Sequence, residues 1–287
     1  MHLQLQQLLN LTFILFLGVY LEKIYLSLSS IIFILLFTLF VEHLFIYIKH
    51  KKIEYISFSS LSTAIGIVLM LVTPYIWLSM LVIALGLFQK HFLTVKGRHF
   101  FNPSNFALIL ALALFYKDAH IVLGQLGDSL WLKLLLSVVA LAMLVRINRW
   151  IIPVGFMLFY LVFEYLFVVS YDPVLVMEEV YHRFYSVSLI LFILFMLTDP
   201  KTTPSNAWQQ LGFALLIAFG SALLDRIYGF RVQHLFMMLF ILSPLVPILT
   251  AKNRKQLLIP TVLILLLAIS VIIFIQGQAP YYFEMDS

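Results

Sequence analysis

Apolar stretches recur along this entire chain, and they constrain its fold more than any other feature. Eleven stretches are recognisable, near residues 8–22, 24–48, 56–73, 75–89, 103–116, 129–146, 150–170, 184–198, 207–224, 232–250 and 257–275. A helix can cross hydrocarbon because it satisfies its backbone hydrogen bonds within one segment. With 63% hydrophobic and 11% charged residues, the chain is predicted to be all-α. We expect a single polytopic membrane domain of about 10–11 transmembrane helices.

Basic residues divide unevenly between the loops on alternate sides of these stretches. One side holds twelve Lys and Arg residues, and the other side holds six. Because cytoplasmic loops are enriched in Lys and Arg, the richer side is predicted to face the cytoplasm of a bacterial inner membrane. The N-terminus is then cytoplasmic and segment 276–287 external. The net charge of +5 follows from this loop bias, so the expected partner is the lipid bilayer and not a nucleic acid.

Two polar segments interrupt the apolar pattern, and both contain Pro-Ser-Asn. The first is KGRHFFNPSNF at 96–106, and the second is TDPKTTPSN at 198–206. Asn102 before Pro103 predicts an N-cap with proline at the first helical position. Thr203 before Pro204 predicts the same arrangement. Each helix start is expected to leave free N–H groups beside a cation, and such helix ends attract anions or polar cofactor groups.

Both helix starts fall on the predicted cytoplasmic side, so we expect them to converge in one ligand site. Asp199, which precedes a proline, is also suited to a turn in which its carboxylate accepts backbone N–H groups. The alternative is that each motif caps only its own helix. The predicted binding residues are Lys96, Arg98, Asn102, Ser104, Asn105, Thr198, Asp199, Lys201 and Thr203.

Two charged residues lie inside predicted spans. A charge at the centre of a bilayer costs about 2.5–3.5 kcal/mol on insertion scales, so Glu164 needs a partner, a cavity or a proton. Lys133 is expected at a similar depth, and the two residues predict either an ion pathway or an interhelical ion pair. Glu42 and His43 are expected to reach water at the inner end of their helix. No metal site is predicted.

Three segments together resemble a known family. They are the segment at 96–106, FMLTDPKTTP at 195–204, and Tyr228-Gly229-Phe230 leading into LSPLVP at 242–247. In this order they resemble the D subunit of Rnf-type electron transport complexes and the related B subunit of sodium-translocating NADH:quinone reductase. The resemblance covers about residues 56–250, and the stretch at 257–275 is additional. It implies a membrane subunit of an ion-pumping, flavin-dependent electron transfer complex with other Rnf-like membrane subunits.

The family's flavin attachment segment is missing from this sequence. In the family, a Ser-Gly-Ala-Thr segment after the fifth span carries FMN through a phosphoester to its threonine. The corresponding loop, 117–129, contains no threonine, so the resemblance predicts no covalent FMN and leaves noncovalent flavin as the open cofactor. The absence of cysteine excludes cysteine-ligated iron–sulfur clusters. The alternatives are a stand-alone transporter or channel for a small polar or anionic solute, and an assembly scaffold without a ligand.

Overall fold

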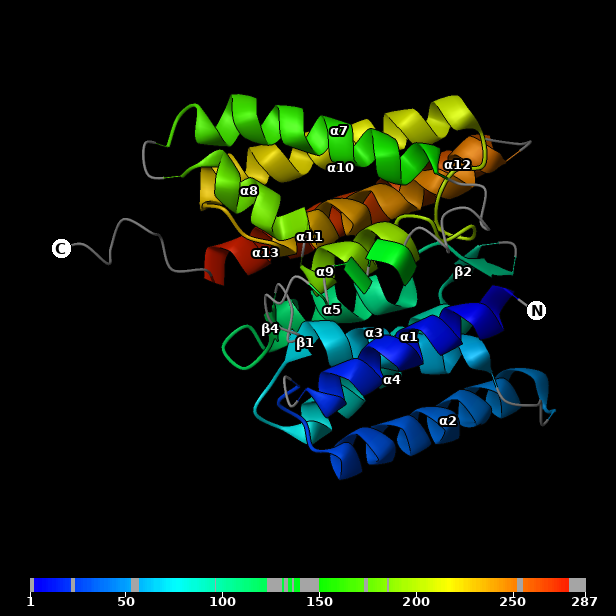
Figure 1. Cartoon of the computed structure of the whole chain (residues 1–287). Helices are drawn as coiled ribbons and strands as arrows, with labels where there is room; N and C mark the ends of the chain where they lie inside the picture. The colour runs from blue at the N-terminus through cyan, green and yellow to red at the C-terminus, as the bar shows by residue number, and fades with distance from the viewer. Residues whose placement is uncertain are drawn as a thin grey trace.

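A computed structural model shows a helical bundle with two short strand pairs (Figure 1). It describes the chain except for residues 1–2, 22–23, 53–56, 96, 123–130, 132–133, 136, 140–149, 173–174, 185, 252–254 and 279–287. Among the described residues, five helices are long and apolar enough to cross a membrane, or six if one bent pair counts as a span. The predicted class of all-α polytopic membrane protein is confirmed.

The long helices follow the predicted apolar stretches closely. They are α2 (Leu28–His50), α7 (Ile151–Glu164) continued by the π-helical η1 (Tyr165–Val169), α10 (Ala207–Tyr228), the series α11 (Gln233–Leu242), η3 (Ser243–Leu245) and α12 (Val246–Thr250), and α13 (Lys255–Gln278). The bent pair is α8 (Met177–Phe184) followed by α9 (Val187–Leu191) and the π-helical η2 (Phe192–Met196), with a bend of 58°. The predicted span at 129–146 lies mostly outside the described residues.

Four other predicted stretches form shorter apolar helices: α1 (Leu3–Tyr20), α3 (Phe58–Met70), α4 (Ile76–Phe92) and α5 (Pro103–Leu114). At 1.5 Å per residue, α3 and α5 reach only about 20 Å and 18 Å, whereas the hydrocarbon core is about 30 Å thick. Neither is therefore long enough to span alone, in contrast to the prediction. Both segments leave the helix early because the strands that follow them pair. The strand β1 (Leu71–Val72) follows α3 and pairs antiparallel with β4 (His120–Ile121), which follows α5.

The short helices α3, α5 and α9 lie in the middle of the bundle, between α2 on one side and the α7–α10 pair on the other (Figure 1). The β1–β4 pair lies at one end of the bundle. The hairpin of β2 (Thr94–Val95) and β3 (Arg98–His99) lies at the opposite end. Since β3 leads directly into α5, this hairpin places the start of α5 at its own end of the bundle.

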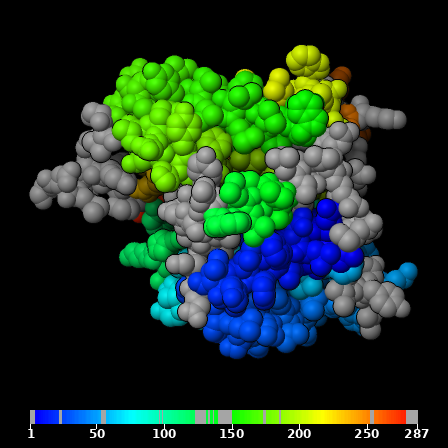
Figure 2. Space-filling model, in the orientation of Figure 1, coloured from blue at the N-terminus to red at the C-terminus, as the bar shows by residue number. Residues whose placement is uncertain are grey.

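Large apolar side chains cover the outer helices. Phe40 on α2 and Leu263 on α13 are 65% and 62% exposed, respectively. Figure 2 shows the blue N-terminal helices and the green helices α7 and α8 on opposite sides of one face. By contrast, α3 and α5 are almost entirely buried. Such a distribution suits lipid contact on the outside and burial of polar groups between the helices.

The contact between α4 and the start of α5 depends on Gly86. A Cβ at Gly86 would lie 2.8 Å from the carbonyl oxygen of Pro103 and 3.0 Å from the Cβ of Ala107. Both atoms are held by the α5 backbone, so Gly86→Ala is expected to destabilise the protein by about 1–3 kcal/mol. Thermal unfolding in detergent measures this loss. Gly212→Ala is the matched control, because nothing lies within 4 Å of that Cβ, and a stability loss there of equal size would contradict the explanation.

Candidate functional site

The start of α5 has the predicted cap. The side chain of Asn102 accepts hydrogen bonds from the backbone N–H groups of Ser104 and Asn105, at 3.1 and 3.2 Å, and Pro103 occupies the first turn. One part of the prediction is wrong, however. These N–H groups are not free to bind an anion, because Asn102 already uses them.

The second motif forms a turn at the end of η2 and does not start a helix. Asp199 accepts a hydrogen bond from the backbone N–H of Lys201 at 3.0 Å, as the sequence predicted for this turn. The predicted cap at Thr203 is wrong, because its hydroxyl donates to the carbonyl of Asp199 at 2.6 Å. Helix α10 begins three residues after Pro204, where Asn206 caps the N–H of Trp208 at 3.0 Å.

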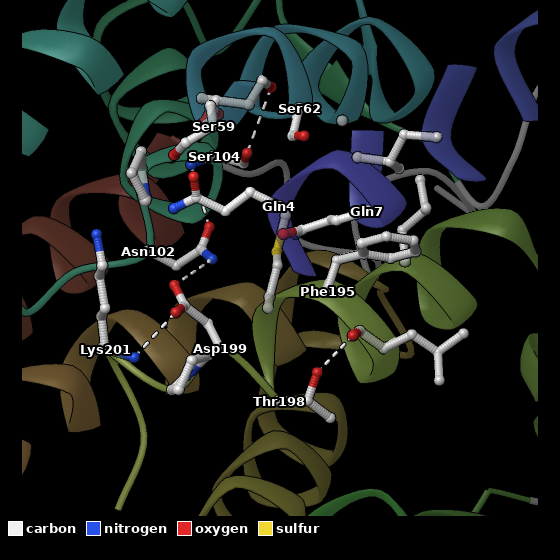
Figure 3. A pocket seen from close by; sticks show the side chains of 18 of the residues that line it. Gln4, Gln7, Ser59, Ser62, Asn102, Ser104, Phe195, Thr198, Asp199 and Lys201 are labelled. Atoms are coloured by element: carbon white, nitrogen blue, oxygen red, sulfur yellow. Dashed lines mark hydrogen bonds between the residues drawn. The ribbon is translucent and has the colours of Figure 1, made fainter. Parts of the chain in front are cut away.

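The two motifs meet directly (Figure 3). Asn102 donates from Nδ2 to the carboxylate Oδ2 of Asp199 over 3.3 Å, although the two residues are 97 positions apart in the chain. The same cap residue therefore holds the N-terminus of α5 and the turn that follows η2. This is the point at which the two segments predicted to converge do so.

A cavity of about 250 Å³ lies beside this contact, and we call it the two-motif cavity. It is lined by α1, by α3 along its length, by β3 and the start of α5, and by the end of α9 with η2 and the turn after it. Its polar lining consists of Gln4, Gln7, Ser59, Ser62, Thr63, His99, Asn102, Ser104, Thr198, Asp199 and Lys201. Figure 3 shows Gln4, Ser59 and Ser104 approaching from different helices around Asn102.

The predicted residues are distributed unevenly around the two-motif cavity. Five of them line it: Asn102, Ser104, Thr198, Asp199 and Lys201. Asn105 does not line it but is fully buried, and neither its Oδ1 nor its Nδ2 has a hydrogen-bond partner among the described residues. Thr203 is buried in the turn. For Arg98 only the backbone, in β3, is described, and Lys96 lies outside the described residues.

Sequence reasoning missed the contributions of α1 and α3. Gln4 and Gln7 are three residues apart and so share one face of α1, the face that meets the cavity. The run of hydroxyl residues from Ser57 to Thr63 was a usable signal, because it coincides with the predicted start of a span. Nothing in that run indicated which other helix start it would face.

Several hydroxyls in the cavity lining already donate their proton within the protein but can still accept a hydrogen bond. The hydroxyls of Ser62 and Thr63 donate to backbone carbonyls one turn earlier, at 2.9 and 3.0 Å. Ser104 donates to the carbonyl of Thr63 at 3.3 Å. These protons are therefore used within the protein, while the oxygen lone pairs can still accept. With the Asp199 carboxylate, the lining offers oxygen acceptors, which suit a small cation or a hydrogen-bond donor.

Burial also changes the proton affinity of two lining residues. Burial, with the positive charge of Lys201 as the next contribution, lowers the pKa of His99 to about 3, so its ring is neutral. Burial raises the pKa of Asp199, which the N–H and the charge of Lys201 partly oppose. Lys201 itself is exposed. Among the described lining residues, Asp199 is the one acid and Lys201 is the one permanently charged base, while His99 is neutral.

A buried ion pair lies between α2 and α4. Glu42, which is 1% exposed, contacts Lys90 Nζ at 2.6 Å and His91 Nε2 at 2.9 Å. The expectation that Glu42 reaches water was wrong, because α4 covers it and supplies both partners. Glu164 does not line the two-motif cavity, and Lys133 lies outside the described residues.

A comparison with known families finds a match to the part of the chain that runs from the end of α5 to the start of α13. A family model described as the NQR2, RnfD, RnfE family matches residues 111–258, more than half of the 287 residues. The chain belongs to this family. A search of curated proteins found no match. Members of the NQR2, RnfD, RnfE family are membrane subunits of ion-translocating electron transport complexes, and the matched range includes Asp199 but begins after Asn102.

The two-motif cavity does not fit a whole flavin mononucleotide. Its volume of about 250 Å³ is below the roughly 300–1,000 Å³ of pockets for drug-sized ligands. The amides of α5 that could hold a phosphate are capped by Asn102, and the carboxylate of Asp199 would repel one. The loop in which the family attaches FMN lies largely in residues 123–130, outside the described residues.

Proposed function

We propose that this NQR2, RnfD, RnfE family member is a membrane subunit that helps couple electron transport to cation movement, without covalent FMN. The contact between Asn102 and Asp199 carries the proposal. It joins the start of α5 to the end of η2 beside a polar cavity, and both helices are buried in the central layer. Short helices that end at a central polar site are typical of membrane proteins that move ions.

The acid and the oxygen acceptors of the cavity favour a cation over an anion, and the one cation of the described lining, Lys201, is exposed. Asp199 directs a carboxylate at the cavity, His99 is neutral, and the N–H groups at the start of α5 are occupied. Hydroxyl and amide oxygens surround the carboxylate. Hard cations are bound by oxygen ligands of these kinds.

The family and the loop charges support a proposal for the placement and the partners of the protein. We place the protein in a bacterial inner membrane, with the two-motif cavity at the cytoplasmic side and other Rnf-like membrane subunits as partners. The support for this orientation is the excess of Lys and Arg on one side.

Isolation of the tagged chain from its own membranes in a mild detergent tests the subunit role. Other polytopic membrane proteins should co-purify in fixed proportion and carry redox cofactors. Asp199→Asn should assemble equally well but lower ion transport driven by electron transfer, because it removes the charge at the cavity. Glu179→Gln, an exposed acid on α8, is the matched control. A tagged chain that is always isolated alone would contradict the subunit role.

A stand-alone transporter for a small polar solute or cation is the second candidate. The small volume of the cavity and its polar lining favour it. The purified protein in flavin-free liposomes would then carry a sodium flux, followed with an entrapped sodium-sensitive dye. Flux that disappears in Asp199→Asn but persists in Glu179→Gln would support this role. Liposomes as tight as protein-free ones would contradict it without affecting the subunit role.

The purified protein is expected to carry no covalent flavin. The missing threonine in loop 117–129 removes the atom to which the family's phosphoester is attached. In a denaturing gel under ultraviolet light, the protein band should therefore not fluoresce, while an FMN-carrying family member run beside it should. A fluorescent band whose flavin peptide contains a Thr or Ser of this chain would show that the prediction is wrong.

A further inference from the structure

A second buried polar cluster lies between α7, α8, α10 and α11. Arg183 Nη1 donates to the hydroxyl of Tyr160 at 2.7 Å and to Oδ2 of Asp225 at 2.8 Å. His234 Nδ1 lies 2.5 Å from Oδ1 of Asp225, and the backbone N–H of Arg231 donates to the same oxygen at 2.8 Å. In Figure 1, α8 lies towards the end of the bundle opposite to β2 and thus to the two-motif cavity.

Glu164 is the member of this cluster without a hydrogen bond. It lies one turn after Tyr160 on α7, beside Asp225 and Arg183, and it is 0% exposed. Neither carboxyl oxygen meets the geometry of a hydrogen bond to any described residue. The same holds for Nε of Arg183 and Nε2 of His234. Buried polar atoms are rarely left without a partner, so this cluster is incomplete as it stands.

With both carboxyls ionised and the ring of His234 neutral, the cluster carries a net charge of −1. The guanidinium of Arg183 balances the carboxylate of Asp225, which leaves Glu164 as a second carboxyl. One proton, carried by Glu164 or by the ring of His234, makes the group neutral. The charges that act most strongly on Glu164 are those of Asp225 and Arg183, while the guanidinium of Arg231 donates to the hydroxyl of Tyr116 at 3.2 Å. Without the proton, one uncompensated negative charge would remain among apolar helices.

We propose that Glu164, with Asp225, Arg183 and His234, binds one exchangeable proton. This site is separate from the two-motif cavity and goes beyond the function proposed for it. The proton is shared by interacting groups, so it belongs to the cluster and not to a single residue. Glu164 is its main carrier, since neither of its oxygens meets the geometry of a hydrogen bond to a described residue.

The geometry favours a proton over a metal ion. Both oxygens of Asp225 are occupied, one by Arg183 and the other by His234 and the N–H of Arg231. Among the described residues, the two oxygens of Glu164 are the carboxyl oxygens of this cluster without a partner, whereas hard cations such as Ca²⁺ take about six to eight oxygen ligands. The charge of Arg183 beside Glu164 also disfavours a second cation. A proton needs one oxygen only.

Labelling with dicyclohexylcarbodiimide tests the proposal on the full-length protein in detergent. This apolar reagent reacts with protonated carboxyls in apolar surroundings. The O–H of the acid adds across one C=N bond, a C–O bond forms, and the proton moves to nitrogen. The acyl group then migrates to nitrogen as a stable acylurea. Mass spectrometry should find the label on Glu164, with a yield that falls as the pH is raised. It should find none on the exposed Glu178 of α8.

Infrared spectroscopy provides a second measurement that needs no access by a reagent. The carbonyl band of a protonated carboxyl should be present in the wild-type protein and absent from Glu164→Gln, and it should disappear at alkaline pH. Glu178→Gln should retain the band. Glu164→Gln resembles the protonated acid in shape, so we expect it to fold with unchanged thermal stability. If the wild-type protein shows neither the label nor the band, or shows both unchanged at every pH, the exchangeable proton is excluded.

Discussion

Replacing Arg183 with alanine is expected to destabilise the protein by about 3–5 kcal/mol, the usual cost of breaking a buried ion pair from one side. Arg183 is 2% exposed and donates to both Asp225 and Tyr160. Its guanidinium also lies 3.1 Å from the ring centre of Phe230. The variant would leave Asp225 and Glu164 as two buried carboxyls without their nearest positive charge. The apparent melting temperature in detergent measures the loss.

A second arginine of the same region supplies the control. Arg226, on the last turn of α10, is exposed, and its guanidinium carbon lies 3.9 Å from the ring centre of Tyr171. Arg226→Ala should cost no more than about 1 kcal/mol, because an exposed cation loses little when its partner is an aromatic ring. Equal melting temperatures for the two variants would mean that Arg183 does not hold the cluster together.

Acid is expected to destabilise the protein through His99. Because the pKa of His99 falls from 6.5 to about 3 on folding, the unfolded chain takes up this proton first. The stabilising contribution is full above about pH 6.5 and is lost as the pH falls towards 3. At about pH 4 the loss amounts to about 3 kcal/mol. His99→Gln should remove this part of the acid sensitivity, measured as melting temperature against pH.

Two comparisons isolate the contribution of His99. His182→Gln changes an exposed histidine on α8 and should leave the acid sensitivity unchanged. Asp199 acts in the opposite direction, since its raised pKa makes the folded state hold a proton more tightly as the pH falls. Asp199 is present in both histidine variants, so its effect cancels in the difference. An acid profile that is the same in wild type and His99→Gln would contradict the burial of a neutral ring.

Local signals in the sequence predicted local structure well. Asn102 caps α5 as predicted, because an N-cap needs only the two or three residues that follow it. Asp199 accepts the N–H of Lys201 for the same reason. The cap predicted at Thr203 failed because two residues competed for the role. The hydroxyl of Thr203 closes the preceding turn, and Asn206 starts the helix.

Pairings between distant helices were not predictable in the same way. Arg183 and Asp225 each lie one residue outside a predicted apolar stretch, 184–198 and 207–224 respectively, yet both are buried and form an ion pair. Glu164 was expected to need a partner, and among the described residues the charges beside it are Arg183 and Asp225. Lys133, the partner considered from the sequence, lies outside the described residues. That a buried charge needs a compensating group can be inferred from a single acidic residue within an apolar stretch. The identity of the compensating group depends on which helices pack together.

The sequence by itself determined the membrane class, the family, most helical stretches and the cap at Asn102, because hydropathy, motifs and capping depend on neighbouring residues. The tertiary structure alone decided that Asn102 meets Asp199 across 97 positions and that Gln4 and Ser59 share their cavity. It also decided that α3 and α5 are too short to span the membrane, since the pairing of β1 with β4 ends the helical conformation of both segments. Such contacts join residues far apart in the chain, and their energies depend on how all the helices pack.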